Sequence, residues 1–124
     1  MNNRILVADD DPEVRDYLSQ VFRGVYNVNA VDVNSAVMHC KMQGYYLLMI
    51  GDEAESVDKV AAKIQEIRKS RPDIRIAWMT TSTISVEQAE EIGTTIVIYK
   101  PIDTNSKVVI NTVALLMEQG GDDV

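Results

Sequence analysis

The chain has 124 residues, of which 46% are hydrophobic, and a formal net charge of −7. This length and apolar content are typical of one domain with a substantial core. The negative charge argues against non-specific binding to nucleic acid and is compatible with a bound cation. No apolar run approaches the length of a membrane span, the N-terminus lacks a signal-peptide pattern, and the single cysteine, Cys40, excludes an internal disulfide. We therefore expect a cytoplasmic domain that binds neither nucleic acid nor membranes, with Cys40 buried as a small apolar residue.

The stretch Arg4–Pro12 combines a strand signal with a helix signal. Four consecutive apolar residues, Ile5–Ala8, predict a strand buried on both faces, and three carboxylates follow directly. Asp11 is a good N-cap, and the proline after it is a good first helical residue. Asp9 and Asp10 are therefore expected at the carboxyl edge of a parallel sheet, where open α/β folds bind ligands.

Apolar periodicity divides the remaining chain into alternating helices and strands. Helical spacing predicts five helices that begin near residues 12, 34, 56, 85 and 104 or 105. Gly24, Gly44, Pro72 and Gly93 end the first four. Shorter apolar runs predict strands at 26–31, 45–50, 74–79 and 96–99. On the last helix, the residues expected to face the core are Val108, Val109, Val113, Leu116 and Met117.

Five strands that alternate with five helices predict an α/β domain with a parallel sheet. Strand crossovers are right-handed, so few topologies remain, and a doubly wound, flavodoxin-like sheet in the strand order 2-1-3-4-5 is the common one. Helices would cover both faces of this sheet in three α/β/α layers. The predicted domain spans residues 1–119, and residues 120–124 would be a frayed tail or the start of a linker.

This strand order brings residues from distant parts of the sequence to one edge of the sheet. Asp9 and Asp10 follow the first strand, Asp52 follows the third, Thr80 ends the fourth and Lys100 ends the fifth. Carboxylates together with water suit Mg²⁺, and a lysine with a hydroxyl suits a phosphoryl group. The sequence therefore predicts a site for a metal ion and a phosphoryl group at this edge.

These residues, in this order, resemble the receiver domain of bacterial two-component response regulators. The resemblance covers nearly the whole chain. Ile5–Pro12 is similar to the opening of that family, and Gly93–Pro101 has the family's spacing from a glycine to a signalling lysine. Thr80, after Ile-Ala-Trp-Met, matches the family's hydroxyl residue. Flavodoxin-like cofactor binding is disfavoured, because no glycine-rich or hydroxyl-rich phosphate loop follows the first strand.

The resemblance implies a signalling domain, not an enzyme. A histidine kinase or phosphotransfer protein would pass a phosphoryl group to an aspartate, with Mg²⁺ held by Asp9, Asp10 and Asp52. Lys100 would neutralise charge, and Thr80 would contact the group once it is attached. The change would then reach the face formed by the fourth helix, the fifth strand and the last helix, where an output domain or downstream protein binds.

The phosphoacceptor position departs from the family's pattern. Aligned without a gap, Gly51 takes the place of the phosphorylated aspartate, and Asp52 comes one residue late, on the opposite face of the strand. A bulge at Gly51, or a register that starts at Tyr46, would return Asp52 to the pocket. Val97 also stands where the family has an aromatic residue. Two hypotheses stay open: Asp52 accepts the phosphoryl group, or the domain is a degenerate receiver that binds a partner without phosphorylation.

Overall fold

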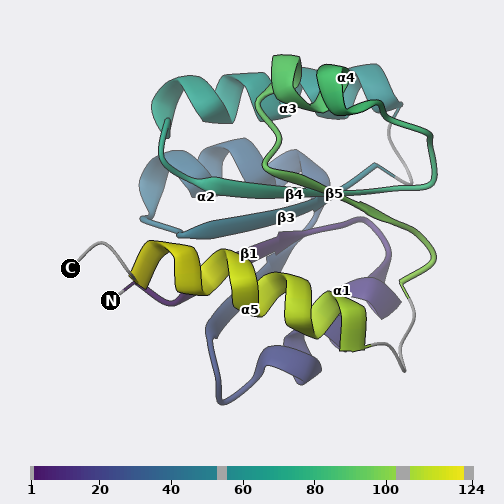
Figure 1. Ribbon diagram of the computed structural model, residues 1–124. Coiled ribbons are helices and arrows are strands. Elements are labelled where there is room, and N and C mark those ends of the chain that lie inside the picture. Colours follow the sequence, from purple (N-terminus) through teal and green to yellow (C-terminus); the bar gives the residue numbers. More distant parts are fainter. Residues whose placement is uncertain (1, 53–55, 103–106, 122–124) are drawn as a thin grey trace.

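The computed structural model describes residues 2–52, 56–102 and 107–121 (Figure 1). In these residues, five parallel strands form one sheet in the order β2-β1-β3-β4-β5, which confirms the predicted topology and the flavodoxin-like fold class. The strands are β1 (Arg4–Ala8), β2 (Asn27–Val31), β3 (Leu47–Gly51), β4 (Arg75–Thr80) and β5 (Ile96–Tyr99).

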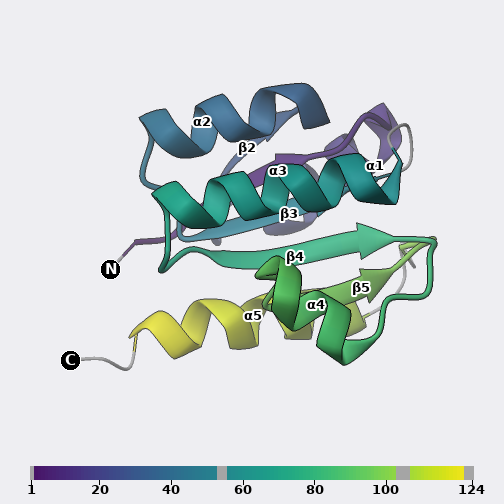
Figure 2. The ribbon, with the colours of Figure 1, turned by 90° about the horizontal axis from the view of Figure 1, so that it is seen from above.

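Helices cover both faces of the sheet, so the domain has three layers (Figures 1 and 2). They are α1 (Pro12–Phe22), α2 (Ala36–Met42), α3 (Val57–Ser70), α4 (Val86–Ile92) and α5 (Lys107–Gly121). The pair α1 and α5 packs on one face, and α2, α3 and α4 pack on the other. Asp11, Ser56 and Ser85 accept backbone hydrogen bonds at the starts of α1, α3 and α4, as their sequence patterns predict. None of the helices in the described residues is long and apolar enough to cross a membrane.

The core lies in two layers, one on each side of the sheet. Along β1, Ile5 and Val7 pack in the layer beneath α1 and α5, whereas Leu6 and Ala8 pack in the layer beneath α2 and α3. All four are fully buried, which confirms that this strand is covered on both faces. Cys40 is buried in the α2/α3 layer and is a free thiol, as expected.

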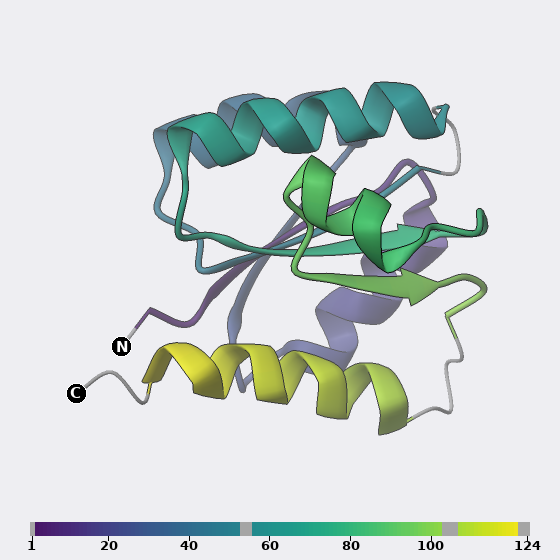
Figure 3. The ribbon, with the colours of Figure 1, turned by 45° about the horizontal axis from the view of Figure 1, so that its top comes forward.

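The carboxyl ends of the parallel strands gather at one edge of the sheet. Figure 3 shows β4 and β5 ending side by side at this edge, where the chain leaves β4 and turns back toward α4. The turn from β1 into α1 and the end of β3 lie at the same edge, because β1 and β3 are neighbours in the sheet. The sheet therefore positions residues 9–11, 51–52, 80–82 and 100 near one another.

Some expected boundaries differ from the structure. The third strand begins at Leu47 and includes Gly51, so the expected span of 45–50 is shifted. The second strand begins at Asn27, and Val33–Ser35 form a short 3-10 turn before α2. The expectation that Val108 faces the core is wrong: it is 70% exposed, because at 100° per residue it lies outside the apolar stripe of α5. The other four residues predicted to face inward on α5 are buried: Val109, Val113, Leu116 and Met117.

Two expectations about the C-terminal region involve residues that the structure does not describe. The expected start at residue 104 or 105 lies outside the described residues, as do residues 122–124 of the expected tail. The helix itself continues to Gly121, two residues beyond the expected end of the domain at 119.

Candidate functional site

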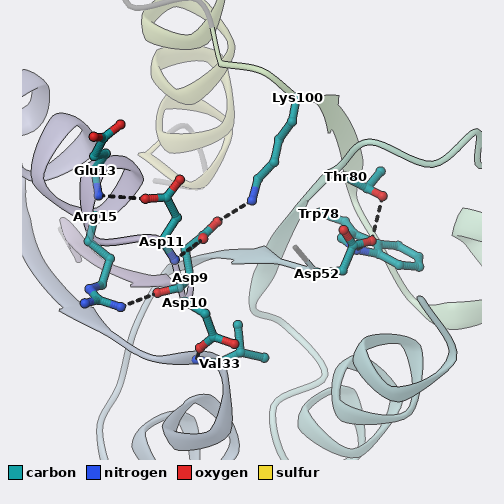
Figure 4. Close-up of polar contacts among 10 residues, drawn as sticks. All are labelled: Asp9, Asp10, Asp11, Glu13, Arg15, Val33, Asp52, Trp78, Thr80 and Lys100. Carbon is teal, nitrogen blue, oxygen red and sulfur yellow. Dashed lines mark hydrogen bonds and ion pairs between the residues drawn. The ribbon is translucent and has the colours of Figure 1, made fainter. Parts of the chain in front are cut away.

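The turn from β1 into α1 fixes the direction of the Asp9 side chain. Asp9 is fully buried directly after β1, and its Oδ1 accepts a hydrogen bond from the Asp11 backbone N–H at 2.9 Å. The Asp9 carbonyl accepts a second bond from Arg15 Nη1, on the first turns of α1, at 2.6 Å. Asp11 in turn caps the helix by accepting a bond from the Glu13 N–H. These contacts hold the Asp9 carboxylate in one orientation (Figure 4).

Asp9 and Lys100 form a buried ion pair. Lys100 Nζ lies 2.7 Å from Asp9 Oδ2, and the two side chains are 3% and 0% exposed. The lysine follows β5, and its backbone N–H donates to the Thr80 carbonyl at 2.8 Å, which fixes the point from which the side chain extends. The structure therefore brings together two of the predicted site residues that are 91 positions apart in the sequence.

Gly51 lies directly beside this ion pair. The strand register is continuous at this point, with Ala8 opposite Ile50 and Gly51 opposite Met79. The chain therefore adopts neither the bulge nor the shifted register that would turn Asp52 toward Lys100. A Cβ atom on Gly51 would lie 2.1 Å from Asp9 Oδ2 and 2.9 Å from Lys100 Nζ. A side chain at this position requires the ion pair to move.

Asp52 belongs to a second group of residues, on the α2/α3 side of the sheet. Its Oδ2 accepts hydrogen bonds from Thr80 Oγ1 at 2.6 Å and from Trp78 Nε1 at 3.2 Å. Asp52 is 5% exposed, and Thr80 and Trp78 are fully buried. Thr80 and Asp52 contact each other, but Figure 4 shows that both are directed away from the Asp9–Lys100 pair, so the predicted site residues do not share one pocket.

Asp10 also points away from Asp9. Its Oδ1 accepts a hydrogen bond from the Val33 backbone N–H at 3.0 Å, so the carboxylate caps the 3-10 turn that precedes α2 (Figure 4). Neighbouring residues at the end of a strand alternate between the two faces of a sheet, and Asp9 and Asp10 follow that rule. Adjacency in the sequence does not give these two carboxylates a shared site.

This arrangement does not fit a Mg²⁺ ion. Mg²⁺ takes oxygen ligands that converge on one point in octahedral geometry, and water fills the coordination positions that the protein leaves open. The two oxygens of Asp9 are bonded to Lys100 and to the Asp11 N–H, and Asp10 and Asp52 accept other hydrogen bonds. The Lys100 ammonium supplies the positive charge beside Asp9. In the described parts of the chain, no group of three His, Cys, Asp or Glu side chains is placed to hold a metal ion.

The polar contacts of Trp78 and Tyr99 were not anticipated from the sequence. The Trp78 indole is fully buried, and its ring N–H donates to Asp52. The Tyr99 hydroxyl donates to the Ile84 carbonyl at 3.2 Å. Alternation along β4 contained part of this signal, because Trp78 and Thr80 are two residues apart and therefore share a face.

Comparisons with known proteins identify the fold. No family model and no curated protein matches the chain. A CheY-like response regulator receiver domain protein from Methanospirillum hungatei JF-1 is 20% identical, with a TM-score of 0.78 over 98% of this chain and 99% of that one. A response regulator from Thermotoga maritima is 14% identical, with a TM-score of 0.80 over 95% and 99%. A pilus assembly-related protein from Burkholderia pseudomallei K96243 is 19% identical, with a TM-score of 0.73 over 94% and 90%. The chain therefore has the fold of response regulator receiver domains.

Proposed function

We propose that this domain acts in signal transduction as a protein-interaction module that does not depend on a phosphoryl group. The receiver fold supports a place in phosphorelay signalling in the cytoplasm. The observation that carries the proposal is the glycine beside the ion pair: a Cβ on Gly51 would lie 2.1 Å from Asp9 Oδ2. The position that matches the family's phosphorylated aspartate therefore has no acceptor, and a side chain there would require the Asp9–Lys100 ion pair to move. Lys100, which would neutralise a phosphoryl group, is instead paired with Asp9.

The partner is proposed to bind the face formed by α4, β5 and α5, which lie next to one another in Figures 2 and 3. A cavity of about 350 Å³ lies between β5 and α5, with residues 96–99 on one side and Val108 and Thr112 on the other. Tyr99 and Val108 are 52% and 70% exposed at this face. The neighbouring helix α4 exposes three carboxylates: Glu87, Glu90 and Glu91. An apolar segment flanked by lysine or arginine, in a downstream protein or an output domain, has the complementary chemistry.

A second candidate is phosphoryl transfer to Asp52 from a histidine kinase or phosphotransfer protein. One contact favours it, since Thr80 Oγ1 lies 2.6 Å from the Asp52 carboxylate. Two features disfavour it. Asp52 is 5% exposed, and the ammonium of Lys100 pairs with Asp9 and not with Asp52.

Acetyl phosphate with Mg²⁺ distinguishes the two candidates. The parent protein and the Asp52→Asn variant would be incubated with this donor, beside a receiver domain known to be phosphorylated, and their intact masses measured. We expect an adduct on the positive control and none on either form of this chain. An adduct on the parent that is absent from the variant would establish Asp52 as the acceptor and reject the first proposal. An adduct on both forms would place the acceptor elsewhere and reject it as well.

A further inference from the structure

The Thr80 hydroxyl connects the Asp52 carboxylate to the segment that leads into α4. Its single hydrogen is donated to Asp52 Oδ2 at 2.6 Å, and its oxygen accepts a hydrogen bond from the Ser82 backbone N–H at 3.0 Å. A hydroxyl can rotate, so the acceptor that takes its hydrogen also decides where its lone pairs point. The carboxylate thereby orients Thr80 to hold the backbone at Ser82.

The carboxylate is itself held in place. Trp78 Nε1 donates to the same oxygen, Asp52 Oδ2, at 3.2 Å, and the indole ring is fully buried in the core. A buried carboxylate is stable only when hydrogen bonds replace its lost hydration. Trp78 and Thr80, both on β4, donate two such hydrogen bonds. Charge-assisted hydrogen bonds of this kind are stronger than neutral ones.

The same segment has a second point of attachment. The Tyr99 hydroxyl, at the end of β5, donates to the Ile84 carbonyl at 3.2 Å. The Ile84 side chain packs against the buried layer beneath α2 and α3. The chain between β4 and α4 is therefore held at Ser82 and at Ile84, immediately before Ser85 caps the first turn of α4.

We propose that Asp52 is a conformational lock for the segment between β4 and α4. Its carboxylate orients Thr80, Thr80 holds Ser82, and α4 keeps one position relative to β5. This inference rests on the proposed function, because a domain that presents a constant binding face needs an internal group to hold that face. It assigns Asp52 a positioning role that requires neither a phosphoryl group nor a metal ion.

Hydrogen–deuterium exchange tests the lock in the absence of any phosphoryl donor. We expect Asp52→Ala and Thr80→Val each to increase exchange over residues 82–92 by about tenfold or more, since a lost hydrogen bond to a charged group is worth about 1.5–3 kcal/mol. Exchange in β1 and β2 would stay at the parent level. Thr80→Ser, which keeps the hydroxyl, would preserve the parent pattern. Asp58→Asn, at an exposed acid in the first turn of α3, is the matched control.

Two outcomes would overturn the lock. Parent-level exchange over residues 82–92 in both Asp52→Ala and Thr80→Val would show that the segment does not depend on this carboxylate. Equal increases throughout the sheet would show a general loss of stability with no local role. Neither outcome bears on phosphorylation, which the acetyl phosphate experiment measures separately. An adduct at Asp52 would reject the proposed function and leave the exchange result to decide the lock.

Discussion

The ammonium of Lys100 and the carboxylate of Asp9 lie 2.7 Å apart, buried at the carboxyl ends of the strands, with side chains that are 3% and 0% exposed. Removal of two opposite charges from water is costly, and their mutual attraction offsets this cost only while both are present. The stability of this edge therefore depends on the pair and not on either residue alone. Four experiments follow from this and from other buried groups.

Lys100→Met should destabilise the protein by about 3–5 kcal/mol, because it leaves the Asp9 carboxylate buried without its partner. The double variant Asp9→Asn, Lys100→Met should recover part of this loss, since neither charge then remains. Urea denaturation followed by circular dichroism measures both values. Lys69→Met, at an exposed lysine of α3, is the control for loss of a lysine. A Lys100→Met free energy of unfolding equal to that of the parent would contradict the importance of the pair.

Gly51→Ala should destabilise the protein by about 1–3 kcal/mol, the usual cost of overpacking a buried site. The added methyl group would lie 2.1 Å from Asp9 Oδ2 and would force the ion pair to move. Gly44→Ala is the matched control, because nothing lies within 4 Å of a Cβ at that position. Denaturant midpoints of the two variants give the comparison. Equal midpoints would show that the space beside Asp9 is not restricted.

Arg68→Met should destabilise the protein by about 2–3 kcal/mol, because several carbonyl groups lose a charged donor. The Arg68 guanidinium donates to the carbonyl of Gly93 at 2.7 Å, to that of Pro72 at 3.0 Å and to that of Ile74. It thus joins the ends of α3 and α4 to the start of β4. Arg68→Lys should recover only part of the loss, since an ammonium cannot reproduce the planar fork. Thermal unfolding of the parent and both variants measures the effect, and a full recovery by lysine would be inconsistent with it.

The stability of the protein should fall between pH 9 and pH 11 because of Cys40. Burial raises the pKa of the Cys40 thiol from its ordinary 9.0 to about 11, against the opposing charge of Arg71. Within this window the unfolded chain binds fewer protons at Cys40 than the folded chain does, so the free energy of unfolding decreases as the pH rises. The slope from this residue approaches about 1.4 kcal/mol per pH unit.

Cys40→Ala provides the comparison, because it lacks the thiol while every other group titrates as in the parent. Denaturation at intervals from pH 8 to pH 11 should give a steeper decline for the parent than for the variant. Parallel curves would refute the assignment. Below pH 9 the contribution of the neutral thiol is fully present, and the two curves should differ only by the constant cost of the substitution.

The fold was predictable because its signals are local. Continuous apolar runs gave the buried strands, and capping residues such as Asp11 and Ser85 marked helix starts. The predicted start of β3 was too early because Tyr45 is buried like a strand residue but does not pair with a neighbouring strand. The Arg4 guanidinium lies over its ring at 4.9 Å, and its hydroxyl accepts from Asn29. Val108 was wrongly assigned to the core, because at 100° per residue it lies outside the stripe formed by Val109, Val113, Leu116 and Met117.

The candidate site was predictable in its components but not in its pairing. Topology brought Asp9, Thr80 and Lys100 to one edge, as expected from the strand order. Whether Asp52 joins Lys100 or Thr80 depends on a single residue of register at Gly51, and glycine allows either a regular strand or a bulge. The pairing of β3 with β4 decides this register. Gly51 pairs with Met79, 28 positions later in the chain, so no pattern near Gly51 predicts the pairing.

The strand order also affects how the sheet can assemble while the chain is being synthesised. After β1 and β2 have paired, β3 joins the free side of β1, β4 joins β3, and β5 joins β4. Each new strand is added to the outside of the existing sheet, and none is inserted between two strands that are already paired. A nascent chain emerging from the ribosome can therefore extend the sheet in the order of translation, without breaking hydrogen bonds made earlier.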